Sequence, residues 1–374
     1  MERIKFELDV PQDIKLIHKV FNDNGFQLFI VGGSIRDAIL GQKPKDWDLT
    51  SEVIPSKVIE MFKDEGFVKN ILLIGESFGV VSLVTENDTF EIATFRSDGE
   101  YTNNRHPDSV TFGTIVEDSK RRDLTCNALF FDLDTSEIVD LVGGVEDLKN
   151  GIIRTVGNAE DRFREDRLRI LRAIRFAARF SNGLDSGIID ALSNDSSLEG
   201  ISSERIRDEF LKGLKSAKSS IFFFEMLDSF NLFDWIFPNL VVNKDFKEDK
   251  DPILQLAILL KDNDPFVLSK MLNKLTFSIV ENKGITFLVS LQGFRSVDDM
   301  FKFKKSHINS GVDNTQICKF ALIFNLNATL IVNFTRFELT IKGEDIMSEF
   351  GLTGKDLGDK IKELETERFK KLCF

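Results

Sequence analysis

Up to about residue 150, the pattern of hydrophobic and polar positions switches between short β-rich runs and helical stretches, with glycines at the junctions. Short apolar runs bounded by turn residues predict strands, and helical periodicity predicts helices after Gly33 and Pro55. The expected strands are residues 26–31, 47–50, 69–74, 79–84 and 90–95. We therefore expect the first part of the chain to be an α/β or α+β domain.

From about residue 158 onward, strand signals are sparse, and segments with helical apolar periodicity follow one another. The expected helices are residues 161–180, 203–214, 221–230, 253–260 and 356–364. A charged strip, residues 243–251, is the expected exposed loop. Because the chain has only seven prolines and no Ser/Gly-rich linker, we expect contiguous packing and not domains on flexible tethers.

The charge balance and the histidines exclude several classes of protein. The chain has 374 residues, with 49 Lys and Arg against 61 Asp and Glu, so its net charge is −12. This excludes a generally basic protein that coats nucleic acid. The three histidines, His18, His106 and His307, are scattered, which excludes a His-built zinc site and a histidine–aspartate phosphohydrolase centre. Any catalytic metal must therefore be held by carboxylates.

The cysteines indicate the compartment. Cys126, Cys318 and Cys373 are odd in number and show no C-x-x-C spacing, which favours a reducing environment over a disulfide framework. The first residues alternate charged and apolar side chains and lack the apolar stretch of a signal peptide. Residues 320–334 are too short for a membrane span and are interrupted by asparagines. We expect a soluble, cytoplasmic protein.

A glycine turn follows the first expected strand of this part. Gly32 and Gly33 allow the backbone to approach a ligand closely, and Ser34 with the amides of the next turn could donate to phosphate oxygens. A triphosphate could bind here, with Arg36 on the helix that follows. The structural alternative is a tight turn between a strand and a helix, because short glycine motifs are weak signals.

Two aspartates follow the glycine turn along the chain, and a glutamate lies further on. Asp46 and Asp48 are separated by one residue, so on a strand both carboxylates would lie on one face. Their repulsion is relieved by a cation between them, and hard oxygen ligands select Mg²⁺ or Mn²⁺. Glu91, inside an apolar run, is the candidate third acid of a two-metal nucleotidyl transfer site. The alternative for each acid is a solvated strand edge.

A basic motif precedes the helical part. Arg121 and Arg122 offer donors for phosphate, and Asp123 offers an acceptor for sugar hydroxyls, with Asn127 in the same segment. In the structural alternative, Asp123 is a helix-start charge and the arginines form a solvated face.

The segment from Glu160 to Phe180 holds seven arginines against four acids, a local charge of +3 in an acidic chain. Helical spacing predicts a buried face of Leu168, Leu171, Ile174 and Ala178. The same spacing places polar candidates on another face: Glu165, Asp166, Arg169 and Arg172. The plainer interpretation is a helix stabilised by intrahelical salt bridges.

A neighbouring acceptor and donor could read a base. Cytosine and adenine present an amino donor beside a ring-nitrogen acceptor, whereas guanine and uracil present the opposite order. Asp166 accepting and Arg169 donating would match C and A and reject G and U. Each good bidentate contact contributes about 1–3 kcal/mol of discrimination.

The order of these motifs resembles the class II tRNA nucleotidyltransferases, the CCA-adding enzymes, a family that also includes bacterial poly(A) polymerases. The resemblance is dense over residues 26–215 and thins out afterwards, although residues 343–347 and 354–358 look like the family's tail signature. It implies that Asp46 and Asp48 hold two catalytic Mg²⁺ ions and that Arg121-Arg122-Asp123 recognises the ribose. It also implies that Glu165, Asp166 and Arg169 form an amino-acid template for the incoming base.

The same resemblance implies roles for further segments. Asp140, Gly143, Gly144, Asp147 and Arg154 look like the family's flexible, spring-like element, and residues 203–206 with Glu209 like a motif that stabilises the template helix. This chain has Arg167 where relatives usually carry proline.

The implied fold is α+β, with a mixed-sheet nucleotidyltransferase head at 1–150, a helical neck with base recognition at 151–215, a helical body at 216–300 and a tRNA-contacting tail at 301–374. The implied activity is addition of C, C and A to tRNA 3′ ends from CTP and ATP, releasing pyrophosphate, with the tRNA 3′ end, CTP and ATP as partners.

Alternatives remain open at this point. Bacterial poly(A) polymerases tend to carry a basic stretch after the active-site aspartates and a basic tail. A poly(A) polymerase is therefore disfavoured here, because residues 73–79 are not basic, and residues 342–374 hold seven Lys and Arg against eight Asp and Glu. A CC- or A-adding specialist shares these motifs. A non-catalytic tRNA- or nucleotide-binding module would need loss of the carboxylates, and both are present.

Overall fold

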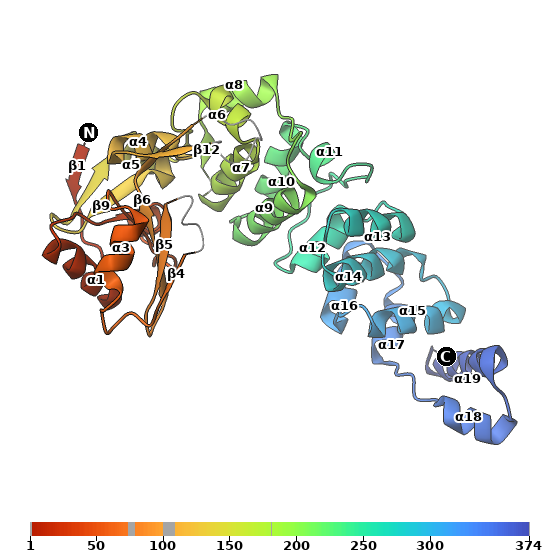
Figure 1. Ribbon diagram of the computed structural model, residues 1–374. Helices are drawn as coiled ribbons and strands as arrows, with labels where there is room; N and C mark the ends of the chain where they lie inside the picture. The colour runs from red at the N-terminus through yellow and green to blue at the C-terminus, as the bar shows by residue number, and fades with distance from the viewer. Residues whose placement is uncertain (1, 74–78, 100–108, 181, 374) are drawn as a thin grey trace. The chain divides into compact units, whose positions relative to one another are not determined.

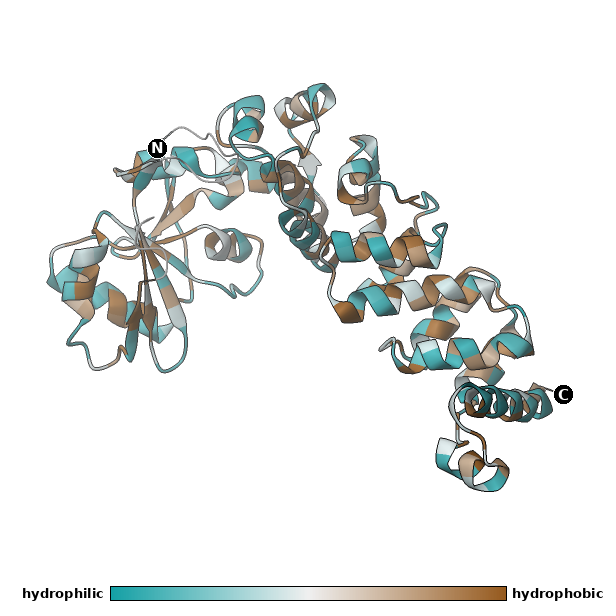
Figure 2. Ribbon diagram, turned by 45° about the vertical axis from the view of Figure 1, so that its right-hand side comes forward, coloured by the Kyte–Doolittle hydropathy of each residue, from teal (hydrophilic) through white to brown (hydrophobic). Residues whose placement is uncertain are grey.

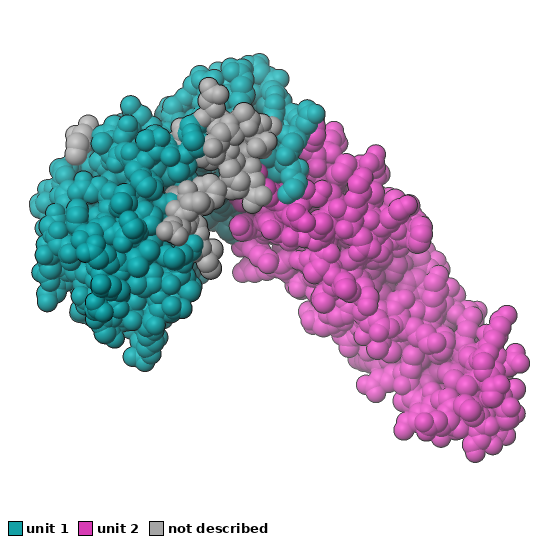
Figure 3. All heavy atoms as spheres, in the orientation of Figure 1, with its two compact units in different colours: residues 1–202, 216–226 teal, residues 203–215, 227–374 magenta. Residues whose placement is uncertain are grey.

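The computed structural model describes residues 2–73, 79–99, 109–180 and 182–373. The chain divides into two compact units, Met1–Ser202 with Ser216–Met226, and Ser203–Lys215 with Leu227–Phe374 (Figure 3). The four-part division expected from the sequence stays a prediction. His106 and residues 74–78 and 100–105 lie outside the described residues.

A mixed β-sheet forms the core of the first unit (Figure 1). Among the described residues it has eight strands in the order β1-β10-β9-β2-β3-β6-β5-β4. Of the strand pairs described in this sheet, only β3–β6 is parallel, and its register places Asp48 opposite Glu91. The strands are β1 Glu2–Lys5, β2 Phe29–Val31, β3 Asp48–Ser51, β4 Asn70–Leu72, β5 Val80–Val84, β6 Thr89–Thr94, β9 Leu129–Asp132 and β10 Glu137–Asp140.

Helices and two short strand pairs complete this unit. α2 packs against β2 and β9, and α3 packs against β5. The helices are α1 Gln12–Asp23, α2 Gly33–Ile39, α3 Pro55–Phe62, α4 Ile115–Arg121, α5 Gly144–Asn150, α6 Ala159–Glu165, α7 Leu168–Phe180 and α8 Ser186–Asn194, with a 3₁₀ turn, η2, at Thr125–Asn127. The pairs are antiparallel β7 Arg96–Asp98 with β8 Val110–Phe112 and parallel β11 Ile152–Ile153 with β12 Gly183–Leu184.

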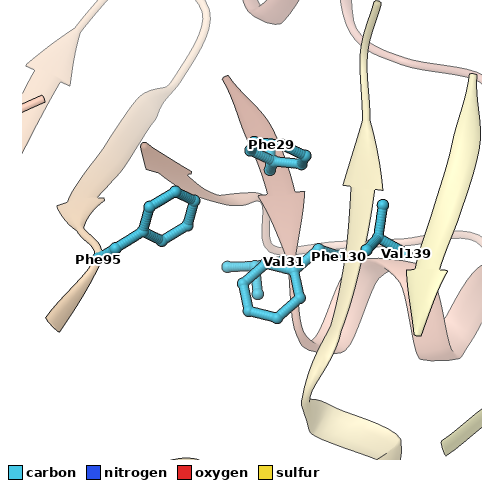
Figure 4. Close-up of a cluster of buried hydrophobic side chains, with 5 residues drawn as sticks. All are labelled: Phe29, Val31, Phe95, Phe130 and Val139. Atoms are coloured by element: carbon cyan, nitrogen blue, oxygen red, sulfur yellow. The ribbon is translucent and has the colours of Figure 1, made fainter. Parts of the chain in front are cut away.

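One hydrophobic cluster lies where the central strands meet (Figure 4). It contains Phe29, Val31, Phe95, Phe130 and Val139, each at most 5% exposed. The ring of Phe95 lies 5.9 Å from that of Phe29 and 6.2 Å from that of Phe130. Alternate side chains of a strand lie on one face of the sheet, and on this face the cluster holds β2, β9 and β10 together, next to the turn that follows β2.

The second unit is helical in its described part. Figure 2 shows hydrophobic and hydrophilic residues alternating around these helices, the pattern of helices that bury one side. Capping boxes start α14, with Ser278 and Glu281, and α16, with Asp313 and Gln316. The helices from residue 203 onward are α9 Ser203–Ser216, α10 Ser220–Ser229, α11 Phe233–Ile236, α12 Pro252–Leu259, α13 Pro265–Lys274, α14 Ile279–Ser290, α15 Met300–Ile308, α16 Asn314–Ile323, α17 Ala328–Arg336, α18 Gly343–Phe350 and α19 Gly354–Cys373.

The expected fold class, α+β with a mixed sheet followed by helices, is confirmed, and each expected strand is found with shifted ends. The single helix expected at 161–180 is wrong, because Asp166 has extended backbone angles and separates α6 from α7. The expected loop at 243–251 contains neither helix nor strand. No helix in the described ranges combines the length and the apolar character that a membrane span requires.

Candidate active site

The turn between β2 and α2 forms one wall of the site. Gly32 has a φ of +80°, a conformation that favours glycine, and its amide donates to the Leu129 carbonyl at 3.0 Å. A Cβ atom at Gly32 would lie 3.7 Å from the Asn127 carbonyl oxygen, 3.8 Å from Arg122 Nη1 and 4.0 Å from Asp48 Oδ2. The glycine therefore keeps open the space that these groups face.

Ser34 is the second residue of α2 and is 2% exposed. Its hydroxyl is buried and has no hydrogen-bond partner among the described residues. Buried hydroxyls normally have a hydrogen-bond partner, so a buried hydroxyl without one, next to a glycine turn, fits a binding site for a polar ligand. This supports the expectation that the turn and Ser34 contact a phosphate.

The acids lie on the neighbouring strands. Asp48 opens β3, between Val31 of β2 and Glu91 of β6 in register, and Asp46 lies two residues before it, outside the strand. The pKa of Asp48 is raised, mainly because its surroundings partly remove its hydration. The charge of Arg122 opposes this rise, and the negative charges of Glu91 and Asp46 add to it. Glu91 and Asp46 thus both repel the charge of Asp48, and a cation would relieve this repulsion.

The described residues include no group of three or more His, Cys, Asp and Glu side chains that could hold a metal ion. A pair of aspartates nevertheless fits Mg²⁺, which commonly takes one or two protein carboxylates and completes its shell with phosphates and water. Asp46 and Asp48 are such a pair. The role of Glu91 as a third ligand stays a prediction.

Arg121 and Arg122 are held by one carboxylate that sequence reasoning missed. Asp118 is completely buried and accepts hydrogen bonds from Arg121 Nε at 2.8 Å and from Arg122 Nε and Nη2 at 3.1 and 2.9 Å. Its second ion pair with Arg121, through Nη2, is 2.7 Å long. The spacing of Asp118 at i−3 and i−4 from the arginines on one helix is the signal that could have found it.

Asp123 follows these arginines in the chain and binds two other predicted site residues. Arg172 donates from Nε at 2.8 Å, and Asn127 Nδ2 donates at 3.1 Å. Burial alone would raise the pKa of Asp123, but the charge of Arg172 and hydrogen bonds from Asn127, Arg172 and the Leu124 amide lower that pKa well below its usual range. Asp123 is therefore ionised at neutral pH.

Arg36 lies behind the glycine turn. Its side chain is buried, with Nε and Nη2 donating to Asp37 Oδ1 at 2.9 and 2.7 Å and Nη1 donating to Asn127. Its guanidinium carbon is 4.8 Å from the Phe176 ring centre and 5.3 Å from that of Phe180. These contacts make Arg36 a link between elements, and a direct nucleotide contact stays a prediction.

The base-reading candidates lie at the junction of α6 and α7. Arg169 Nη1 donates to Glu165 and, at 3.0 Å, to the Arg162 carbonyl. Asp166 does not share a helical face with them as expected, because it ends α6 and accepts from the Leu168 amide at 3.0 Å. Arg162 binds the carbonyls of Arg121 and Arg122 at 2.5 and 3.0 Å, which connects this junction to the phosphate-binding candidates.

The segment implied to be spring-like is tied down at both ends. The Asp140 carboxylate accepts from the amides of Val142, Gly143, Gly144 and Val145, and so fixes the start of α5. Arg154 pairs with Asp147 at 3.1 Å and with Asp185 at 2.5 Å. Its flexibility stays a prediction.

Family models match two parts of the chain: the poly A polymerase head domain at residues 28–154, and the probable RNA- and SrmB-binding site of polymerase A at residues 189–243. The chain is 31% identical over 390 residues to the CCA-adding enzyme of Ligilactobacillus salivarius, an alignment that covers 96% of this chain and 93% of that enzyme. It is also 32% identical over 272 residues to poly(A) polymerase I of Salmonella typhi, covering 69% of this chain and 56% of the relative.

Its alignment with the CCA-adding enzyme of Lactobacillus helveticus is 43% identical over 196 residues and covers 52% of this chain and about half, 47%, of the relative. Among solved structures, the Bacillus stearothermophilus CCA-adding enzyme in complex with CTP superposes with a TM-score of 0.71 at 24% identity, covering 95% of this chain and 91% of that one. At this identity, the structural likeness shows a shared fold.

Proposed function

This chain belongs to the class II nucleotidyltransferase family, which includes CCA-adding enzymes and bacterial poly(A) polymerases, and from that premise we propose that it adds C, C and A to tRNA 3′ ends from CTP and ATP. The observation that carries the proposal is the convergence of Asp48, Arg122 and Asn127, which donates to Asp123, beside the Gly32 turn. In this proposal the acids serve phosphoryl chemistry, and the residues around α6 and α7 choose the base.

Asp46 and Asp48 would hold two Mg²⁺ ions at this site. When bound, Mg²⁺ neutralises phosphate charge and increases the acidity of an attacking hydroxyl. Arg121 and Arg122 offset the charge of the triphosphate, and the unpartnered Ser34 hydroxyl donates to a phosphate oxygen. The protein's contribution is positioning and charge neutralisation while the tRNA 3′-hydroxyl displaces pyrophosphate from the α-phosphate.

Selection of the base falls to Asp166 and Arg169, with Asp123 accepting from the ribose 2′-hydroxyl. Glu165 and the Arg162 carbonyl fix one nitrogen of Arg169, so the guanidinium plane is oriented before a base binds. A donor and an acceptor in this order match the pairing edges of C and A. The protein thus selects nucleotides without a nucleic-acid template.

A poly(A) polymerase is the second candidate, because relatives with that name align over 69% of this chain. The alignment with a CCA-adding enzyme over 96% of the chain favours CCA addition. A CC- or A-adding specialist is a narrower form of the same proposal. The three cysteines are free, which supports the proposed cytoplasmic location.

The test uses a tRNA that lacks its CCA end, incubated with CTP alone, ATP alone or both, and products resolved at single-nucleotide length. We expect two additions with CTP and a third that requires ATP. Long A tails with ATP alone would assign the chain to the poly(A) polymerases. Absence of extension, equal to that of an Asp46→Ala/Asp48→Ala double variant, would leave only a binding role.

A further inference from the structure

A continuous series of polar contacts crosses the first unit from α2 to α7. Arg179, near the end of α7, donates to Asp37 Oδ2 at 2.9 Å, and Arg36 donates to the other oxygen of the same carboxylate. Arg36 also donates to the Asn127 side-chain oxygen, and Asn127 donates to Asp123. Asp123 in turn binds Arg172, about two helical turns before Arg179 on α7. The series therefore starts and ends on the same helix.

Its central members are shielded from water. Arg36 is 4% exposed and Asp37 is 9% exposed, whereas Arg179 keeps 27% of its side-chain surface. The guanidinium of Arg36 is also packed near the rings of Phe176 and Phe180 on α7, which lie 6.0 Å apart and nearly parallel. A buried arginine is stable here because its charge is paired with Asp37 and its flat face contacts aromatic rings.

The two arginines of α7 that bind this series lie at different distances from Arg169 along the helix. Arg172 and Arg179 are seven residues apart, and Arg169 lies beyond Arg172 at the start of the helix. At 1.5 Å per residue, Arg179 is roughly 15 Å along the axis from Arg169. The Arg172–Asp123 pair is thus the nearer of the two supports to Arg169, and the Arg179–Asp37 pair is the farther one.

We propose that Asp37 and Arg179 are positioning residues for base selection: their ion pair holds α7 against α2, so that Arg169 keeps a fixed distance from the Gly32 turn. The inference rests on the proposed function only in that Arg169 reads the base. Neither residue needs to touch the nucleotide. Base-edge hydrogen bonds are short and directional, so a tilt that moves Arg169 weakens the distinction between C and U more than it weakens phosphate binding.

The test compares CTP with UTP in two assays for Arg179→Gln, Asp37→Asn and the double variant. The first assay is kcat/KM for the first addition to a tRNA lacking CCA, and the second is calorimetric binding of each nucleotide with Mg²⁺. We expect the CTP/UTP ratio to fall about tenfold in each single variant, the effect of losing about one base contact. The double variant should lose no more selectivity than Asp37→Asn alone, because Asp37→Asn already removes the ion pair with Arg179.

Two further variants separate positioning from stability. Arg179→Lys should restore most of the selectivity, because the contact of Arg179 with Asp37 uses a single nitrogen. Arg164→Gln is the matched control: Arg164 is 64% exposed and pairs with Glu160 and Asp161 on the surface of α6, and its loss should leave the ratio unchanged. Thermal unfolding of every variant shows whether it is folded.

A lowered melting temperature with the wild-type CTP/UTP ratio in Arg179→Gln would overturn the inference and assign the pair a purely structural role. Equal loss of CTP and UTP affinity would overturn it as well. If the wild type extends no tRNA but prefers CTP to UTP in binding, and Arg179→Gln abolishes that preference, the inference stands and CCA addition fails. Because Arg179 is partly exposed, its variant keeps the test available even where Asp37→Asn does not fold.

Discussion

Replacing Asp118 by alanine should weaken both the fold and the nucleotide site. The carboxylate is completely buried and binds Arg121 and Arg122 through contacts of 2.7 to 3.1 Å. Removing one partner of a buried ion pair costs about 3–5 kcal/mol. The arginine side chains keep 20% and 17% exposure, so water recovers part of this, and we expect a loss of about 3 kcal/mol.

Calorimetric melting and steady-state kinetics measure the two effects. For a unit of this size, about 2–4 °C is lost per kcal/mol, so the transition of the first unit should fall by roughly 6–12 °C. Without Asp118 the two guanidiniums repel each other and lose their fixed positions, so KM for CTP should rise about tenfold, equivalent to about 1.4 kcal/mol. An Asp118→Ala protein that melts within about 2 °C of wild type and keeps its KM would refute this reasoning.

The matched control is Asp64→Ala. The Asp64 side chain is 89% exposed and lies 3.9 Å from Lys63, a surface pair that contributes little to stability. We expect its effect on the free energy of unfolding to stay within about 0.5 kcal/mol.

The other predictions concern chemistry, pH and the core. Asp48→Asn should lower kcat for nucleotide addition at least about a hundredfold while CTP still binds, measured by single-turnover extension; retained turnover would exclude Asp48 from catalysis. Because the folded-state pKa of Asp123 is lowered, its contribution to stability is present above about pH 4, the unfolded value, and is lost as pH falls toward the folded value. Chemical denaturation between pH 2 and 7 should therefore show a flatter acid limb for Asp123→Asn than for wild type, and equal slopes would contradict the assignment. Phe130→Ala should cost about 3–5 kcal/mol of unfolding free energy in the same assay, because Phe130 is completely buried in the sheet cluster, and a loss below about 1 kcal/mol would show that the cluster collapses around the gap.

Local signals in the sequence were sufficient to predict most strands and helices and to identify the motif residues. Short apolar runs bounded by turn residues located the strands, and the glycine pair located the turn beside Asp48, because both signals depend on neighbours within a few residues. The break at Asp166 was missed because Phe163 lies at helical spacing from Ile170 and no proline or glycine marks a helix end between them. The spacing of apolar residues also gives no sign that the Asp166 side chain caps the start of α7.

The long-range partners could not be predicted in the same way. Asp37 meets Arg179 across 142 positions of the chain, and Asp123 meets Arg172 across 49. Such pairs depend on how α7 packs against α2 and η2, which neither helical spacing nor strand alternation specifies. Asp118 is the intermediate case, since its helical spacing to Arg121 and Arg122 was readable but its complete burial was not.

The most direct test of the central claim is the rate of single-nucleotide addition by the wild-type protein to tRNAs ending before the first C, after the first C and after the second C, with each of the four nucleoside triphosphates in turn. We expect the protein to add a nucleotide from CTP to the first two substrates and from ATP to the third, and to add nucleotides from UTP and GTP at least about tenfold more slowly to every substrate. Comparable rates with UTP or GTP, or continued addition of A beyond the third position, would contradict base selection by Asp166 and Arg169 and CCA addition by this chain.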